Sequence, residues 1–118
     1  GMANVVNRLV EFFENLEPSR KVVVDIGLVY ETTAAQMREA MEILKGIADA
    51  TDKVAPDPIV AFTAFGDFAM NIKFIYFIEP GADIFGTQSH VNLEILEKFG
   101  AAGLDMAFPT QTIYHQAV

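Results

Sequence analysis

The sequence predicts an α+β sandwich in which two helices cover one face of a four-stranded β-sheet. Strand-like alternation and helix-like apolar spacing follow one another in the order strand, helix, strand, strand, helix, strand. The chain has 118 residues, a length that suits one domain. Its apolar fraction of 52% is ample for a hydrophobic core.

The first predicted strand covers residues 21–30, where apolar side chains recur with a period of two. Its β-branched residues suit a pleated sheet. The side chains expected on the buried face are Val22, Val24, Ile26, Leu28 and Tyr30. Before this strand, residues 4–17 have apolar spacings that fit a helix or a strand, and Pro18 ends that segment.

The first predicted helix starts behind Thr33 and runs to about residue 50. Thr33 and Gln36 have the spacing of a capping box, in which each side chain bonds the other residue's backbone amide. Pro56 and Pro58 block any continuation of the helix. One apolar stripe at helical spacing is formed by Met37, Ala40, Met41, Leu44, Ile47 and Ala48.

A β-hairpin follows, with strands predicted over residues 59–65 and 68–78 and a turn at Gly66-Asp67. The second of these strands alternates strictly, and one face carries Met70, Ile72, Phe74, Tyr76 and Ile78. Residues 79–82, with the sequence Glu-Pro-Gly-Ala, close the hairpin with a turn.

The second helix is predicted within residues 87–102, ending before Gly103, which is suited to a left-handed conformation. Its inward side chains are expected to be Val91, Ile95, Leu96 and Phe99. Residues 105–114 are predicted to form the last strand, which Pro109 interrupts because proline cannot donate to a ladder.

This order of elements is that of the ferredoxin-like βαββαβ sandwich, here predicted over residues 21–114. Residues 1–20 are expected to be a tag remnant, Gly1-Met2, and a segment that leads into the domain; residues 115–118 form a tail. Two helices on one face leave the other sheet face partly uncovered. That face is predicted to be a partner surface, and its apolar residues are Val23, Val29, Ala69, Ile75 and Phe77.

Composition excludes several classes of protein. The net charge is −8 and the pI is near 4.5, which argues against nucleic-acid binding and docking on an anionic membrane surface. The absence of cysteine excludes disulfides, thiolate metal sites and a cysteine nucleophile. The mean hydropathy of +0.29 is high, yet no apolar run approaches the roughly 20 residues of a membrane span. We therefore expect the surplus hydrophobicity in the core or against other chains, and no signal peptide.

Motifs for catalysis, metal binding or phosphate binding are lacking, so no cofactor and no metal is predicted. His90 and His115 have no neighbouring ligand residues, and Ser19 and Ser89 lie in no nucleophile motif. Gly100 and Gly103 follow a helix rather than opening one, which does not suit a phosphate cradle.

Carboxylates and aromatic residues are interpreted as structural. Asp25 falls on the less covered sheet face, where a solvated carboxylate or an intersubunit ion pair is commoner than a catalytic base. The acidic pairs Asp49/Asp52 and Glu94/Glu97 are assigned to solvated surface. The cluster of Phe62, Phe65, Phe68, Phe74 and Phe77 is assigned to core packing rather than nucleobase stacking, because no basic residues interleave it. We therefore predict that the protein is not an enzyme.

The last predicted strand contains the sequence Ala107-Phe108-Pro109-Thr110-Gln111-Thr112-Ile113-Tyr114. This run closely resembles the closing motif of the small-conductance mechanosensitive channel family. Other segments resemble that family in the same order along the chain: Glu14-Asn15-Leu16 with Arg20, residues 26–32, residues 62–68 and residues 91–99. The resemblance covers roughly residues 7–114. The family's usual Pro-Asn pair is absent, and Asn7-Arg8 stands in its place.

The resemblance implies a non-catalytic vestibule domain on the cytoplasmic face of the cell inner membrane, without the family's transmembrane helices and most of its middle β-domain. It implies a heptameric ring in the full-length protein, attached to the membrane through the missing N-terminal helices. It further implies that this fragment is itself soluble, as a monomer or dimer. It also implies that the terminal strands gather in a small barrel. The residues predicted to make these oligomer contacts are Pro109, Thr110, Gln111, Thr112, Ile113 and Tyr114.

Two alternatives remain open. The first is a free-standing ferredoxin-like regulatory module that binds a small molecule at a dimer interface, which the exposed sheet face and acidic balance would suit. The second is a small hydrolase or isomerase, which would require a cleft carboxylate or histidine with a perturbed pKa. The native reading frame before Asn4 distinguishes the first alternative from a channel domain.

Overall fold

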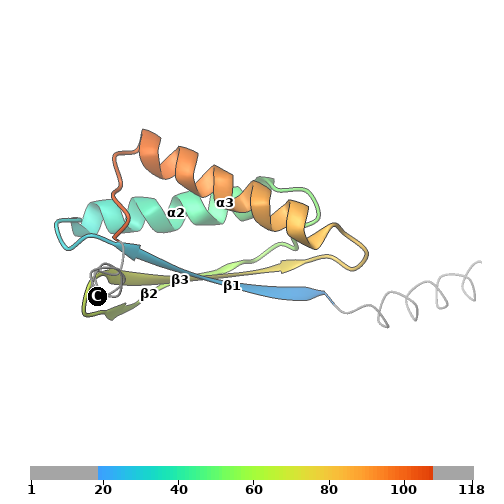
Figure 1. The fold of residues 1–118 in the computed structure, drawn as a ribbon, viewed down its shortest axis with the longest axis horizontal. Helices are drawn as coiled ribbons and strands as arrows, with labels where there is room; N and C mark the ends of the chain where they lie inside the picture. Colours follow the sequence, from blue (N-terminus) through green and yellow to red (C-terminus); the bar gives the residue numbers. More distant parts are fainter. Residues whose placement is uncertain (1–18, 108–118) are drawn as a thin grey trace, which may run out of the picture.

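The structure is a computed structural model that describes residues 19–107. Five elements follow in the order β1 (Arg20–Leu28), α2 (Ala34–Ala50), β2 (Ile59–Phe65), β3 (Met70–Ile78) and α3 (Ile84–Ala101). Both helices lie on the same face of the sheet (Figure 1). The predicted α+β class, with two helices on one face, is therefore confirmed.

The sheet of the described residues has three antiparallel strands in the order β1-β3-β2. β3 lies in the centre and pairs with both neighbours, so that Phe74 is opposite Val24 on one side and Val60 on the other. The register against β2 shifts between Phe62 and Ala64, which marks a bulge. The hairpin predicted for β2 and β3 is thus confirmed, although β3 begins at Met70 rather than at Phe68.

Only the first three residues of the fourth strand predicted over residues 105–114 fall within the described part of the chain. Met106 forms an antiparallel bridge with Leu28, at the end of β1. Two backbone bonds flank it: Val29 N–H donates to the carbonyl of Asp105 at 3.1 Å, and Ala107 N–H donates to that of Gly27 at 2.9 Å. The remainder of that strand, residues 1–18 and the tail at 115–118 lie outside the described residues.

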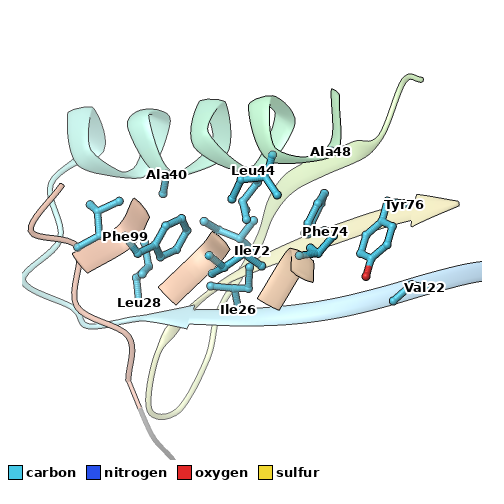
Figure 2. Packing of buried hydrophobic residues seen from close by; sticks show 14 of the residues in the cluster. Val22, Ile26, Leu28, Ala40, Leu44, Ala48, Ile72, Phe74, Tyr76 and Phe99 are labelled. Atoms are coloured by element: carbon cyan, nitrogen blue, oxygen red, sulfur yellow. The ribbon is translucent and has the colours of Figure 1, made fainter. Parts of the chain in front are cut away.

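The hydrophobic core fills the space between the helices and the sheet (Figure 2). Every second residue of β3 from Met70 to Ile78 is buried, as the alternation predicts. From α2, the buried side chains are Met37, Ala40, Leu44, Ile47 and Ala48, and from α3 they are Val91, Ile95 and Phe99. The apolar stripe predicted for the first helix is therefore confirmed, with Met41 partly buried at its margin.

Local hydrogen bonds fix the ends of both helices. The capping box of α2 is confirmed, since Gln36 N–H donates to Thr33 Oγ1 at 3.2 Å and Thr33 N–H donates to Gln36 Oε1 at 2.9 Å. The second helix begins at Ile84 rather than Thr87, because Asp83 caps it and accepts from Gly86 N–H at 3.0 Å. It ends at Ala101, before Gly103 as predicted, and Gly103 has a φ of +72°.

Two residues predicted to be inward are exposed. Tyr30 lies beyond the end of β1, which stops at Leu28, and its hydroxyl donates to the carbonyl of Gly66. Leu96 lies on the outer side of α3, because Ile95 and Phe99 already occupy the stripe that faces the sheet. In both cases the apolar pattern in the sequence is wider than the face that is buried.

Tyr76 is a polar exception within the core. Its side chain projects from β3 into the layer under the helices and is only 1% exposed (Figure 2). Among the described residues its hydroxyl has no hydrogen-bond partner, and burial raises the pKa of this phenol above its ordinary value. An unpartnered buried hydroxyl costs free energy, so this residue limits the stability of the core.

We expect Tyr76→Phe to increase the free energy of unfolding by about 1 kcal/mol at neutral pH, because it removes the unpartnered hydroxyl. Because of the raised pKa of Tyr76, the free energy of unfolding of the native chain also depends on pH in the alkaline range. The native stability is fully present below the ordinary tyrosine pKa of about 10 and falls as pH rises through the higher folded value. Urea denaturation at pH 7 and near pH 11 measures both effects. Tyr30→Phe, at an exposed tyrosine, is the control and should lose as much stability between pH 7 and pH 11 as the native chain does. A Tyr76→Phe variant that loses as much stability over this range as the native chain would contradict this account.

Candidate interaction surfaces

The sheet face opposite the helices carries an exposed apolar row that crosses all three strands. Ile75 of β3 is directly opposite Val23 of β1 and Ile59 of β2. Val23 and Ile59 are 46% and 51% exposed, although side chains of their kind are usually buried. Phe77 lies half-buried two residues along the same face of β3. Of the other two residues predicted on this face, Val29 and Ala69 lie just beyond the strand ends.

An ion pair lies next to this row on the same face. Lys73 Nζ lies 3.4 Å from Asp25 Oδ1, across the pairing of β3 with β1. The Asp25 side chain is 72% exposed, so water screens the pair and its contribution to stability is small. The structure thus places Asp25 in a solvated ion pair at the margin of an apolar row.

A second apolar surface lies on the outer side of α3. Phe85, Leu93 and Leu96 are 83%, 62% and 58% exposed, and spacings of 8 and 11 residues from Phe85 put them on one side of a helix. Glu94 and Lys98 pair elsewhere on the helix at 3.5 Å. The sequence interpretation missed this surface, because it placed Leu96 inward and began the helix after Phe85. Asp83 was the signal for the earlier start, as a residue suited to cap a helix.

The phenylalanine cluster divides between core and surface. Phe74 is fully buried and Phe77 is half-buried, but Phe62, Phe65 and Phe68 are exposed. The rings of Phe62 and Phe65 meet edge to face, with centroids 5.0 Å apart. The core-packing prediction is therefore wrong for these three residues. They lie on or just after β2, an edge strand of the described sheet that α2 covers only in part.

A groove of about 330 Å³ opens between β1 and α3. One wall is four consecutive residues of β1, and the other is one side of α3. Residues that follow α3 close one end of it. The lining residues are Val24, Asp25, Ile26, Gly27, Asn92, Ile95, Leu96, Met106 and Ala107.

Residues considered for chemistry are dispersed. Within residues 19–107, no three histidine or acidic side chains lie close enough together to hold a metal ion. His90 is exposed in the second turn of α3, which begins at Ile84. Ser19 and Ser89 are both exposed. His115 and the predicted contact residues 109–114 lie outside the described part of the chain. None of the described helices is long and apolar enough to cross a bilayer.

Comparison with known proteins gives one consistent family. Residues 22–106 match the family described as "Mechanosensitive ion channel MscS, C-terminal". The chain is 36% identical over 97 residues to the "Small-conductance mechanosensitive channel MscMJ" of Methanocaldococcus jannaschii, in an alignment covering 80% of this chain and 28% of that protein. It is 37% identical over 113 residues to the "Large-conductance mechanosensitive channel MscMJLR" of the same organism, covering 88% and 31%.

A bacterial relative agrees with this family. The chain is 28% identical over 115 residues to the "Uncharacterized MscS family protein" of Aquifex aeolicus, covering 94% of this chain and 31% of that protein. The chain therefore spans less than a third of the length of the curated relatives that it matches.

We expect Asp25→Asn to change the free energy of unfolding by less than about 1 kcal/mol, because the ion pair with Lys73 is solvated. Urea denaturation in low and high salt measures this change, and the small difference from the native chain should shrink further in high salt. Lys73→Met should behave in the same way. A loss of several kcal/mol in either variant would contradict a solvated pair.

Proposed function

The chain belongs to the MscS family of mechanosensitive ion channels, and we propose that it forms part of the cytoplasmic vestibule of such a channel. In this role it is non-catalytic. It helps the subunits to assemble and filters the ions and osmolytes that approach the pore. The complete protein is then a membrane protein, with this domain on the cytoplasmic face of the cell's inner membrane.

One observation carries this proposal, namely the position of the family match. It begins in β1 and ends at Met106, the residue that forms the bridge back to Leu28. The match therefore covers the whole described fold, and not an isolated motif. Both Methanocaldococcus relatives are named as mechanosensitive channels, and each aligns with at least 80% of this chain.

Exposed apolar surface supports the assembly role. The row around Ile75 and the outer side of α3 lie on opposite layers of the domain. A closed ring of identical subunits needs two different complementary surfaces on each subunit, and a domain with apolar surface on both layers can provide them. In our proposal the ring is a heptamer, and residues 109–114 of each subunit pair with those of its neighbours.

The bridge at Met106 supports a complete ferredoxin-like order. In that order the last strand is antiparallel to the first and lies on its outer edge, which is where Met106 meets Leu28. We take residues 105 onward as the start of this fourth strand. The chain then leaves the domain on the β1 side of the sheet.

Charge supports the filtering role. The chain has 16 acidic and 8 basic residues, and several copies around one cavity would give it a negative potential. Screening limits that potential to about 8–10 Å at physiological salt, so it acts within the vestibule and at its openings. Cations would collect near the pore, while the width of the openings limits the size of what passes.

A regulatory module that binds a small molecule is the second candidate. The groove between β1 and α3 favours it, since its volume of about 330 Å³ lies at the lower end of the range for ligand sites. A complete native reading frame without membrane-spanning helices would favour this candidate over the channel domain. The family match favours the channel domain.

We expect the protein made from the complete native reading frame to form a large ring oligomer and to give tension-gated currents. Size-exclusion chromatography with light scattering measures the assembly, and patch-clamp recording under membrane tension measures gating. Removing residues 109–118 should weaken assembly, because it removes the proposed contact strand. Removing residues 115–118 alone is the matched control and should leave assembly unchanged. A monomeric protein without tension-gated current would overturn the proposal.

A further inference from the structure

The groove between β1 and α3 lies where the chain continues beyond its described residues. Ala107 is both the last described residue and part of the groove lining. Its N–H donates to the carbonyl of Gly27 at 2.9 Å, so the backbone already runs along the outer edge of β1 as it reaches the groove. The other lining residues of β1, Val24 to Ile26, are the next ones that an antiparallel strand would meet.

The register between residues 105–107 and residues 27–29 determines which residue of β1 each later residue of the chain would face. The two bonds flank the pair Leu28 and Met106, which makes it a non-hydrogen-bonded pair. Continuing the same antiparallel register by two residues puts Phe108 opposite Ile26. Residues directly opposite each other point to the same face of a sheet. Ile26 points into the core under the helices and is 4% exposed, so that face is the apolar one.

We propose that the groove binds the Phe108 side chain of the same chain, and we call it the seat of Phe108. The inference rests on the fourth strand proposed above and adds to it a residue and a binding site. The apolar part of the lining suits an aromatic ring, since Ile26, Ile95 and Leu96 come together there from β1 and α3. The ring covers Leu96, which is 58% exposed in the described residues despite its apolar side chain.

Pro109 ends the ladder directly after this seat. Every second residue of β1 can form hydrogen bonds across its outer edge, so the next such residue after Gly27 is Asp25. The same register puts Asp25 opposite Pro109. Proline has no N–H to donate to the Asp25 carbonyl, although its own carbonyl can accept from Asp25 N–H. The strand therefore stops at residue 109. Phe108 anchors the chain to its own domain, and Pro109, at the end of this ladder, begins the run of residues 109–114 proposed above for contacts with other subunits.

A double-mutant cycle on the 118-residue chain tests the seat. Phe108→Ala should lower the folding equilibrium constant at least about tenfold, because it empties an apolar site. Combined with Leu96→Ala, the losses should be non-additive by roughly threefold or more, because the two side chains touch. Leu93→Ala is the matched control: Leu93 is exposed to a similar degree on the same helix but does not line the groove. Its combination with Phe108→Ala should be additive within about twofold.

The cycle also identifies the occupant. Equal coupling to Leu93 and Leu96, or no coupling to either, overturns the proposal. Coupling that depends on protein concentration means that the ring comes from a second copy, which also overturns it. These measurements need neither a membrane nor a ring oligomer, so their outcome is separate from that of the channel proposal.

Amide hydrogen exchange in the unmutated chain gives a test that does not depend on a variant's folding. The N–H groups of Asp25 and Val23 both point to the outer edge of β1, by the same alternation that directs Val29 N–H to Asp105. We expect Asp25 N–H to be protected by the carbonyl of Pro109, and Val23 N–H to exchange freely. Fast exchange at Asp25 contradicts the seat, and protection at both residues contradicts an end of the ladder at Pro109.

Discussion

The burial of one face of β3 is the constraint on which the rest of the structure depends. β3 is the central strand, and its inward residues from Met70 to Ile78 are covered by both helices. This face can be buried only if α2 and α3 lie on the same side of the sheet (Figure 1). The opposite face of the sheet, its edges and the outer sides of the helices are then the surfaces left for partners. The apolar residues found on those surfaces are therefore available for contact with other chains.

This arrangement suits the vestibule role proposed above, which is mechanical and electrostatic. Among the described residues no three histidine or acidic side chains come together to hold a metal ion, and the one carboxylate within β1 forms a solvated ion pair. What the domain does provide is exposed apolar surface, an acidic composition and a backbone that runs along the outer edge of β1 at residues 105–107. In the assembly around a pore that we propose, each of these features has a use.

Much of the fold could be predicted from the sequence, because local chemistry and burial agree there. The Thr33 capping box, the stripe of α2 and the alternation of β3 each depend on residues close together in the chain. The predicted burial of side chains is wrong where the sequence has more apolar residues than the fold has buried positions. Leu96 and Phe65 have the composition of core residues, but whether a neighbouring element covers them depends on how wide the sheet is and where α3 crosses it. Periodicity along one element does not contain that information.

The candidate surfaces were predictable only in part, for the same reason. The uncovered sheet face followed from the alternation of β1 and β3, and Val23 and Ile75 lie on it as expected. The groove was not foreseen, because it requires β1, α3 and residues 106–107 to meet.

The central claim is that this domain is a working part of a tension-gated channel. Its most direct test is a chimera in which residues 22–106 of this chain replace the matching part of MscMJ, with patch-clamp recording in membranes under tension. The account predicts that the chimera assembles in the membrane and opens under tension. A chimera that folds and reaches the membrane but stays monomeric, or gives no current at any tension the membrane withstands, would contradict it.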